Sequence, residues 1–546
     1  MSFRQFIAIF VLFAGTAAAE YREAPMLAER VQAGKLPPVV ERLPENPLVV
    51  QPVRSIGKHG GTWERLCINP NDTNMQSGLG YEPLARWDQT GRKVVPGLAD
   101  SWEIRDDGTT YVFHLRRGIK WSDAHPFTAE DVLFWFEDIA SNKDLHPIFP
   151  TMFTPDGNHF RLTAPDPYTV EFHFERPNGM FLEMMAFRGG WMYAPKHYLK
   201  QFHIRYADRT ELEQQARDTG LGVWHRLFLK MSDLHYNTEL PTVRPWKISV
   251  APPAMRYVAG RNPYYWKVDP AGNQLPYIDR INFTVVQNVE MLNLKAMNGE
   301  SDNQGHYLET PKYTLFMENR ERGKYRIQAD RRSTLGVYVN HYSKDPEIRP
   351  ILQDRRFRIA LMLAINREEI IELAFRGLAA PSRGVSMPED PYFQPWFNEL
   401  YLEYEPDRAN RLLDEVGLKR GRDGMRRMPD GKPFRQLIHW SPEDSPQSEM
   451  WELVVEYWRE VGLHFVLKPE ARTLFRLPPQ CAALNRNRCN QDELVVKGAL
   501  EGNRKAIEQA VALDPLTAAS VLTLDEIKAM VDELFAAQRE EIADFA

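Results

Sequence analysis

The chain of 546 residues is 43% hydrophobic and 26% charged, an ordinary composition for a globular protein. One hydrophobic core rarely serves so long a chain, so we expect two or more domains. The formal net charge of −6 gives no basic surface for nucleic acid, and we expect no nucleic-acid partner. The 3 cysteines (Cys67, Cys481 and Cys489) are too few and uneven for a disulfide framework, although a bridge between the last two stays open.

Residues 1–19 have the pattern of a secretory signal peptide. Arg4 supplies the positive start, residues 6–14 form an apolar run, and alanines at residues 17–19 precede the expected cleavage site. The alternative is a membrane anchor, but the apolar run is too short to cross a bilayer. Because no cysteine lies near the cleavage site, we expect a soluble protein of a Gram-negative periplasm rather than a lipoprotein.

Residues 20–51 are expected to form an extended amino-terminal arm. A short amphipathic segment comes first, and prolines then favour an extended backbone (Pro37, Pro38, Pro44 and Pro47). We expect the arm to wrap the surface without a role in binding.

Residues 81–139 are predicted to form strands, turns and a helix. Residues 102–104 and 111–115 alternate apolar and polar side chains around a turn at residues 106–108, which is typical of a hairpin with one buried face. Thr128 is placed to cap a following helix, whose apolar residues recur at helical spacing.

This stretch resembles the signature of a family of bacterial proteins, the peptide- and nickel-binding solute-binding proteins of ABC importers (family 5). The matching segments are residues 96–99, 101–102, 107–110, 113–116, 118–121 and 127–132. Further matches lie at residues 261–266, 274–281, 296–302, 354–366 and 458–463. Ala124 departs from the family pattern, which has Gly at this turn, and we expect little cost because type I turns tolerate alanine.

The resemblance implies an α/β protein with two lobes that close on a solute. The first lobe would span residues 52–330, including an inserted subdomain at about residues 81–190, and the second would span residues 331–476. Such a protein carries out no covalent chemistry. It would act as a monomer that delivers a solute to the permease subunits of an ABC transporter in the inner membrane.

Two segments of the first lobe supply candidate ligand-binding residues. The turn-rich residues 69–74 would face the cleft by resemblance, which makes Asn71 and Asp72 candidates, although a solvated turn is the alternative. Trp191 and Tyr193 could stack on a sugar or peptide, although core packing is the alternative for these large aromatic side chains.

Gln304 and His306 are two further candidates. They follow residues 299–302, which match the family where ligand-facing backbone is expected. For His306 the alternative is a hydrogen-bonded surface side chain.

The resemblance to the family ends near Phe475, so we expect the second lobe to be incomplete and followed by a short helical tail. Residues 477–546 instead resemble the carboxyl end of NAD- and metal-dependent glycosidases that include bacterial α-galactosidases. Thr523 and Glu526 are spaced as a capping box, and an apolar stripe extends from Ile527 to Phe535. From the incomplete lobe we expect low stability of residues 450–475 and weak solute binding.

No enzymatic motif accompanies this tail. The chain has no Gly-rich dinucleotide loop after a strand, no P-loop and no metalloprotease or serine-hydrolase motif. The tail cysteines have no nearby histidine, so we expect no metal and no cofactor. A glycosidase and a non-functional fusion product stay open as alternatives. A binding protein joined to a galactosidase-like tail favours an α-galactoside oligosaccharide as solute, with peptide second.

Overall fold

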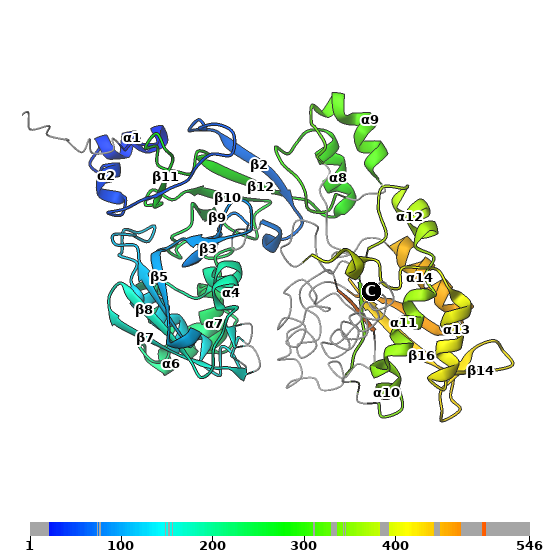
Figure 1. The fold of residues 1–546 in the computed structure, drawn as a ribbon. Coiled ribbons are helices and arrows are strands. Elements are labelled where there is room, and N and C mark those ends of the chain that lie inside the picture. Colours follow the sequence, from blue (N-terminus) through cyan, green and yellow to red (C-terminus); the bar gives the residue numbers. More distant parts are fainter. Residues whose placement is uncertain are drawn as a thin grey trace, which may run out of the picture. The chain divides into compact units, whose positions relative to one another are not determined.

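The structure of the chain is a computed structural model (Figure 1). It describes residues 21–73, 75, 78–147, 149–150, 153–154, 157–308, 312–328, 336–341, 343, 345–382, 393–441, 448–470 and 494–497. The chain divides into two compact units. Unit 1 comprises Met1–Phe153, Asn158–Leu292 and Glu300–Gln304, and unit 2 comprises Thr154–Gly157, Asn293–Gly299 and Gly305–Ala546. The signal-peptide prediction for residues 1–19 lies outside the described residues.

The amino-terminal arm of unit 1 is part of the folded body. It contains α1 (Pro25–Gln32), α2 (Val39–Arg42) and β1 (Leu48–Val49), and β1 pairs in parallel with β11 (Lys267–Val268). Arg42 is fully buried and donates hydrogen bonds to the carbonyls of Pro37 and Pro263, to Gln274 Oε1 and to Glu23 Oε1. The arm therefore contributes a buried cation that binds it to residues 263–274.

The inserted subdomain contains an antiparallel sheet in the order β5-β6-β8-β7. Its strands are β5 (Ala99–Arg105), β6 (Thr110–Leu115), β7 (Phe160–Asp166) and β8 (Thr169–Phe174). The predicted hairpin is confirmed by the pairing of β5 with β6. The predicted cap is also confirmed, because Thr128 forms a capping box with Asp131 at the start of α3 (Ala129–Phe134). Two short strands, β3 (Ala85–Trp87) and β4 (Val94–Pro96), pair beside this sheet.

Ala124 occupies a strained position in the turn that leads to α3. The Trp121 N–H donates to the His125 carbonyl at 2.7 Å, and Ala124 has a φ of +76°. This left-handed conformation is costly for any residue with a Cβ. The prediction that alanine costs little here is therefore wrong, because the turn needs a positive φ at this residue.

The second sheet of unit 1 has the order β2-β12-β10-β9. Its strands are β2 (Thr62–Cys67), β9 (Trp246–Val250), β10 (Arg256–Arg261) and β12 (Arg280–Val285). β2 runs parallel to β12, whereas the other neighbours are antiparallel. One face buries a cluster that includes Cys67, Tyr257, Ile281 and Phe283. β2 is thus the outer strand, and one face of it points into this cluster.

Four helices complete unit 1. They are α4 (Phe181–Arg188), α5 (Lys196–Leu199), α6 (Arg209–Asp218) and α7 (Trp224–Met231). Between α5 and α6, His203 is 2% exposed and both of its ring nitrogens contact backbone. Nε2 lies 2.9 Å from the Asp138 carbonyl, and Nδ1 accepts from the Arg205 N–H at 3.2 Å. A proton on Nδ1 would oppose that N–H, so the neutral ring suits this site.

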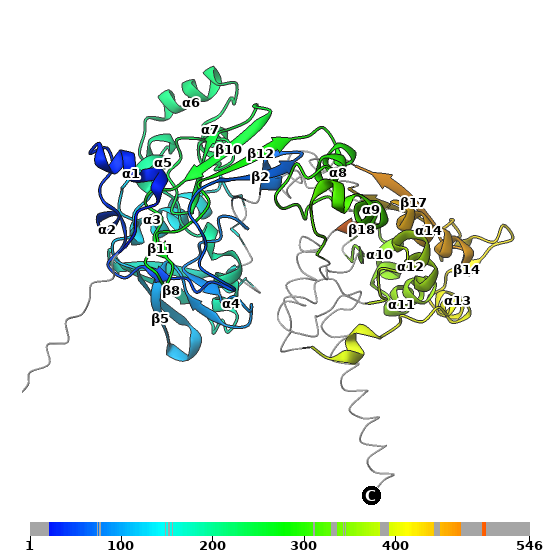
Figure 2. The same ribbon diagram turned by 90° about the horizontal axis from the view of Figure 1, so that it is seen from above.

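Unit 2 packs helices against a four-stranded sheet in the order β13-β18-β16-β17. The strands are β13 (Gly336–Tyr338), β16 (Arg435–Trp440), β17 (His464–Pro469) and β18 (Leu494–Lys497), and β14 (Lys419–Arg420) pairs separately with β15 (Arg426–Arg427). The helices are α9 (Tyr313–Gly323), α10 (Ile348–Gln353), α11 (Arg355–Leu363), α12 (Arg367–Phe375), α13 (Pro406–Glu415) and α14 (Ser448–Glu460). Another helix, α8 (Val289–Met297), contains the point at which the chain passes from unit 1 to unit 2. In both views α11, α12, α13 and α14 lie together (Figure 1, Figure 2). The predicted caps are confirmed, since Asp354 and Asn366 accept from the backbone at the starts of α11 and α12.

The tail is described only at residues 494–497, which form a strand. β18 pairs with β13 in antiparallel and with β16 in parallel. The prediction of a helical tail is wrong for these residues, because their Leu-Val-Val sequence favours a strand and the sheet supplies partners. The predicted capping box and apolar stripe at residues 523–535 lie outside the described residues, as do Cys481 and Cys489. In the described part of the chain, no helix is long and apolar enough to cross a membrane.

Candidate functional site

The loop after β2 is held by the side chain of Asp72. This residue lies in a short 3-10 turn (Pro70–Thr73) and is 5% exposed. Its Oδ2 accepts from the backbone N–H groups of Ile68 at 3.0 Å and Asn69 at 2.9 Å. Asn71 lies in the same turn, but its side chain is outside the described part of the structure. The Asp72 carboxylate therefore shapes the loop, and the loop projects from the carboxyl end of β2.

Residues 301–304 lie along the free edge of β2. Glu64 N–H donates to Asp302 Oδ2 at 2.7 Å, and Leu66 N–H donates to Gln304 Oε1 at 3.4 Å. Gln304 is half-buried and lies beside the strand that leads to Asp72, and its predicted contact with a solute stays a prediction. In unit 2, His306 is exposed and its ring stacks on that of Tyr307, with centroids 4.1 Å apart.

Tyr193 is a packing residue of unit 1. It is 6% exposed, and its hydroxyl donates to the Glu82 carbonyl at 2.8 Å. Its ring packs against the rings of Trp121 and Phe127. Of the two alternatives for Tyr193, the structure favours core packing over ligand contact.

Trp191 differs from Tyr193 because it is 37% exposed. The Arg188 guanidinium lies 4.8 Å from its ring centroid and 4.5 Å from that of Phe187, which is 45% exposed. Two aromatic rings and a cation thus share one surface at the end of α4. The sequence analysis missed Phe187, although its position four residues before Trp191 on a helical segment was a usable signal.

Arg244 fixes the turn that carries Trp191. It donates from Nε to the Gly80 carbonyl and from Nη2 to the Gly190 carbonyl, each at 3.0 Å. Gly189 is tightly packed, because a Cβ there would lie 2.2 Å from Met185 Sδ. The exposed aromatic pair therefore stands on a rigid turn, which favours binding without a large ordering cost.

A buried ion pair lies beneath this region. Lys267 Nζ is 2.8 Å from Glu82 Oε2, and the Tyr265 hydroxyl donates to Glu82 Oε1 at 2.7 Å. Burial lowers the pKa of Lys267 to about 8, while Glu82 acts in the opposite direction. Both charged groups have hydrogen-bond partners, so this pair serves the packing of unit 1.

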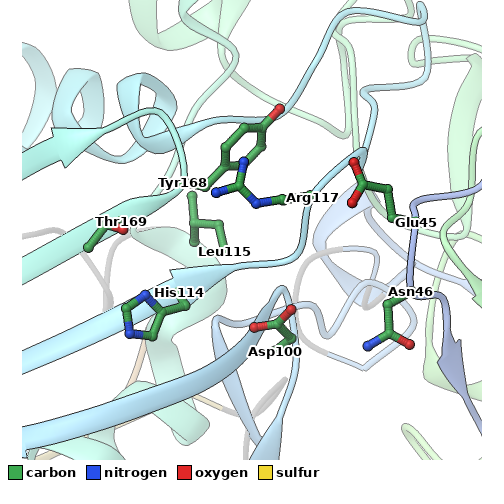
Figure 3. A pocket seen from close by; sticks show the side chains of 8 residues that line it. All are labelled: Glu45, Asn46, Asp100, His114, Leu115, Arg117, Tyr168 and Thr169. Atoms are coloured by element: carbon green, nitrogen blue, oxygen red, sulfur yellow. The ribbon is translucent and has the colours of Figure 1, made fainter.

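A separate hollow of about 140 Å³ lies between the arm and the inserted sheet of unit 1 (Figure 3). It is lined by Glu45, Asn46, Asp100, His114, Leu115, Arg117, Tyr168 and Thr169. The Arg117 guanidinium lies over the Tyr168 ring, 4.6 Å from its centroid (Figure 3). Pockets for drug-sized ligands measure roughly 300–1,000 Å³, so this hollow is small for an oligosaccharide or peptide. No predicted site residue lines it.

Comparison with known proteins decides the family. The model of bacterial extracellular solute-binding proteins, family 5 (Middle), matches residues 93–493. This chain belongs to that family. The match continues past Phe475, so the prediction that the resemblance ends there is wrong. β18, which lies directly beyond the match, pairs with β13 and β16.

Individual family 5 relatives differ in the solutes that they are named for. The periplasmic α-galactoside-binding protein of Rhizobium meliloti (strain 1021) is 29% identical over 490 residues, which cover 82% of this chain and 68% of that protein. A solved oligopeptide-binding protein OppA is 40% identical with a TM-score of 0.63, covering 92% of this chain and 78% of that one. MelB of Agrobacterium fabrum C58, solved with stachyose, has a TM-score of 0.67 at 23% identity, covering 88% of this chain and 74% of that one. This last likeness shows the fold alone.

These family 5 relatives confirm the two-lobed α/β binding-protein fold, and they are solute-binding proteins rather than enzymes. The chain spans 68% and 64% of the length of two curated relatives. Within the described residues, no group of three or more His, Cys, Asp or Glu side chains could hold a metal ion.

Proposed function

We propose that this protein captures an α-galactoside oligosaccharide in the periplasm and delivers it to the permease of an ABC transporter. The observation that carries the proposal is the 29% identity, over 82% of the chain, to the periplasmic α-galactoside-binding protein. Asn71, Asp72, Trp191, Gln304 and His306 stay the predicted contacts, whereas the sixth candidate, the buried Tyr193, is assigned to core packing.

The Asp72 loop offers no free negative charge for the ammonium group of a peptide. A peptide carries an ammonium and a carboxylate, which require opposite fixed charges in a binding site. The Asp72 carboxylate is buried and already accepts two backbone N–H groups. The exposed rings of Phe187 and Trp191 instead offer apolar faces to the C–H faces of sugar rings.

Peptide is the second candidate, because the solved relative of 40% identity is named an oligopeptide-binding protein. Calorimetric titration of the whole mature chain with stachyose, raffinose and a set of tripeptides separates the two candidates. We expect micromolar or tighter binding of the sugars, about −8 kcal/mol or stronger, and no heat with the peptides. Tight peptide binding without sugar binding would overturn the sugar assignment.

The same titration tests the expectation that binding is weak. That expectation depends on the resemblance ending near Phe475, whereas the family match continues to residue 493. A chromogenic α-galactoside, supplied with NAD and Mn²⁺, tests the glycosidase alternative for the tail. We expect no turnover.

A further inference from the structure

Arg65 places a cation among aromatic rings on the inner face of β2. It alternates with Glu64 and Leu66, so its side chain shares a face with Trp63 and Cys67. Its guanidinium carbon lies 5.2 Å from the ring centroid of Trp63 and 5.9 Å from that of Phe283, which is directly opposite in β12. The charge therefore stands at the border of the apolar cluster of this sheet.

This guanidinium has no counter-charge in the described structure. Arg65 Nε is buried and has no hydrogen-bond partner, and no ion pair of the side chain is found among the described residues. The adjacent Glu64 points to the other face, where Oε1 accepts from Asn282 Nδ2 at 2.7 Å. Burial lowers the pKa of Arg65, with the Cys67 thiol acting in the opposite direction, but an arginine stays charged at neutral pH.

A buried Nε without a hydrogen-bond partner also occurs at Arg116, so the difference lies in the remaining nitrogens of the side chain. Six arginines are buried, and each of them donates hydrogen bonds to a carbonyl or a carboxylate: Arg42, Arg116, Arg244, Arg261, Arg358 and Arg426. Arg65 is half-buried and donates none. Partial burial without an ion pair disfavours the charged form of Arg65, and a ligand that supplies hydrogen-bond acceptors would offset this cost.

We propose that Arg65 anchors the solute, donating N–H groups to the hydroxyl oxygens of a neutral sugar ring whose apolar face lies on Trp63. The inference rests on the proposed function. The position supports it, because β2 leads directly into the Asp72 loop and its free edge contacts Gln304. The planar guanidinium offers paired N–H donors that match two neighbouring oxygens.

Two substitutions at Arg65 separate a binding role from a structural role. Arg65→Met keeps an unbranched aliphatic side chain and removes the positive charge. Arg65→Lys keeps the positive charge and removes the paired N–H donors of the planar guanidinium group. Arg280→Met is the matched control, because Arg280 is exposed at the start of the neighbouring strand β12. For each variant, the melting temperature without ligand and the stachyose affinity by calorimetry are measured on the whole chain.

We expect Arg65→Met to weaken stachyose binding at least tenfold while its melting temperature stays equal or rises, because an unpaired charge has been removed. Arg65→Lys should fall between Arg65→Met and the wild type in affinity, and Arg280→Met should change neither quantity. A melting temperature several degrees lower for Arg65→Met would assign Arg65 a structural role and overturn the inference. Unchanged affinity in Arg65→Met would also overturn it, while leaving the proposed function intact.

The wild-type measurements test the proposed function separately. Wild-type protein that binds tripeptides and no α-galactoside would overturn the solute class and, with it, the sugar contact of Arg65. Salt provides a further test of the neutral ligand, because hydrogen bonds to hydroxyl groups are hardly screened. We expect the wild-type affinity for stachyose to change less than twofold between 50 and 500 mM NaCl, whereas a steep fall would contradict a neutral contact.

Discussion

Replacing Arg42 with alanine should release the amino-terminal arm from unit 1. The fully buried guanidinium donates to two carbonyls, to the Gln274 side chain at 3.0 Å and to Glu23. Its loss would leave the Pro37 carbonyl and Gln274 Oε1 without this donor and Glu23 without its cation, while the Pro263 carbonyl keeps a hydrogen bond from Gln274 Nε2. Breaking a buried pair costs about 3–5 kcal/mol, and other unsatisfied buried groups cost about 1–3 kcal/mol each before the site relaxes. We therefore expect the free energy of unfolding to fall by about 4 kcal/mol.

Urea denaturation of the Arg42→Ala variant measures this loss, and limited proteolysis reports whether the arm detaches first. Arg30→Ala is the control, because Arg30 is exposed in the last turn of α1 and should change stability by less than about 0.5 kcal/mol. If Arg42→Ala loses less than about 1 kcal/mol and its arm resists protease as the wild type does, the arm is held by its apolar contacts and the reasoning fails.

Four further substitutions test other parts of unit 1. Ala124→Gly should raise the free energy of unfolding by about 0.5–1 kcal/mol. Relief of the positive φ contributes about 1–2 kcal/mol, and the greater unfolded-state entropy of glycine offsets part of this gain. Thermal melts check this value, and an unchanged melting temperature would contradict the strain at Ala124. Burial lowers the pKa of His203, so the unfolded state takes up a proton first and stability should fall as pH drops below about 6.5; melts between pH 8 and pH 5 should show a smaller loss for His203→Gln. Trp191→Ala should weaken stachyose binding at least tenfold without lowering the melting temperature. Tyr193→Phe should do the reverse, losing about 1 kcal/mol of stability and no affinity, because only its hydroxyl bond to Glu82 is removed.

Local patterns in the sequence predict the elements of unit 1 well where the elements depend on near neighbours. The alternation in β5 and β6 and the cap at Thr128 each involve residues within a few positions of one another. Ala124 shows the limit of such reasoning, because the turn type alone does not reveal which of its residues takes a positive φ. The backbone bond from Trp121 to His125 imposes that conformation.

Contacts between distant segments decided the candidate site, and the sequence held little information about them. Trp191 and Tyr193 are two residues apart and chemically similar, yet one is exposed and the other is buried. The difference arises because the Tyr193 hydroxyl meets the Glu82 carbonyl, 111 positions earlier in the chain. In the same way, β18 became a strand because β13 and β16 offered it hydrogen-bond partners.

Asp72 and Arg65 differ in whether their charged groups already have hydrogen-bond partners within the protein. A charged group with such partners stabilises the local structure, whereas one without them can bind a ligand. The sequence drew attention to Asp72, since its turn-rich loop would face the cleft by resemblance to the family. The structure uses that carboxylate for two backbone N–H groups, so moving it to a ligand would leave those donors unsatisfied, at a cost of about 1–3 kcal/mol each. Arg65 lies within a strand, and its buried Nε has no hydrogen-bond partner in the described structure. A solute oxygen that meets Arg65 therefore compensates a partly desolvated cation without breaking a hydrogen bond, whereas a solute contact with the Asp72 carboxylate would compete with two backbone N–H groups.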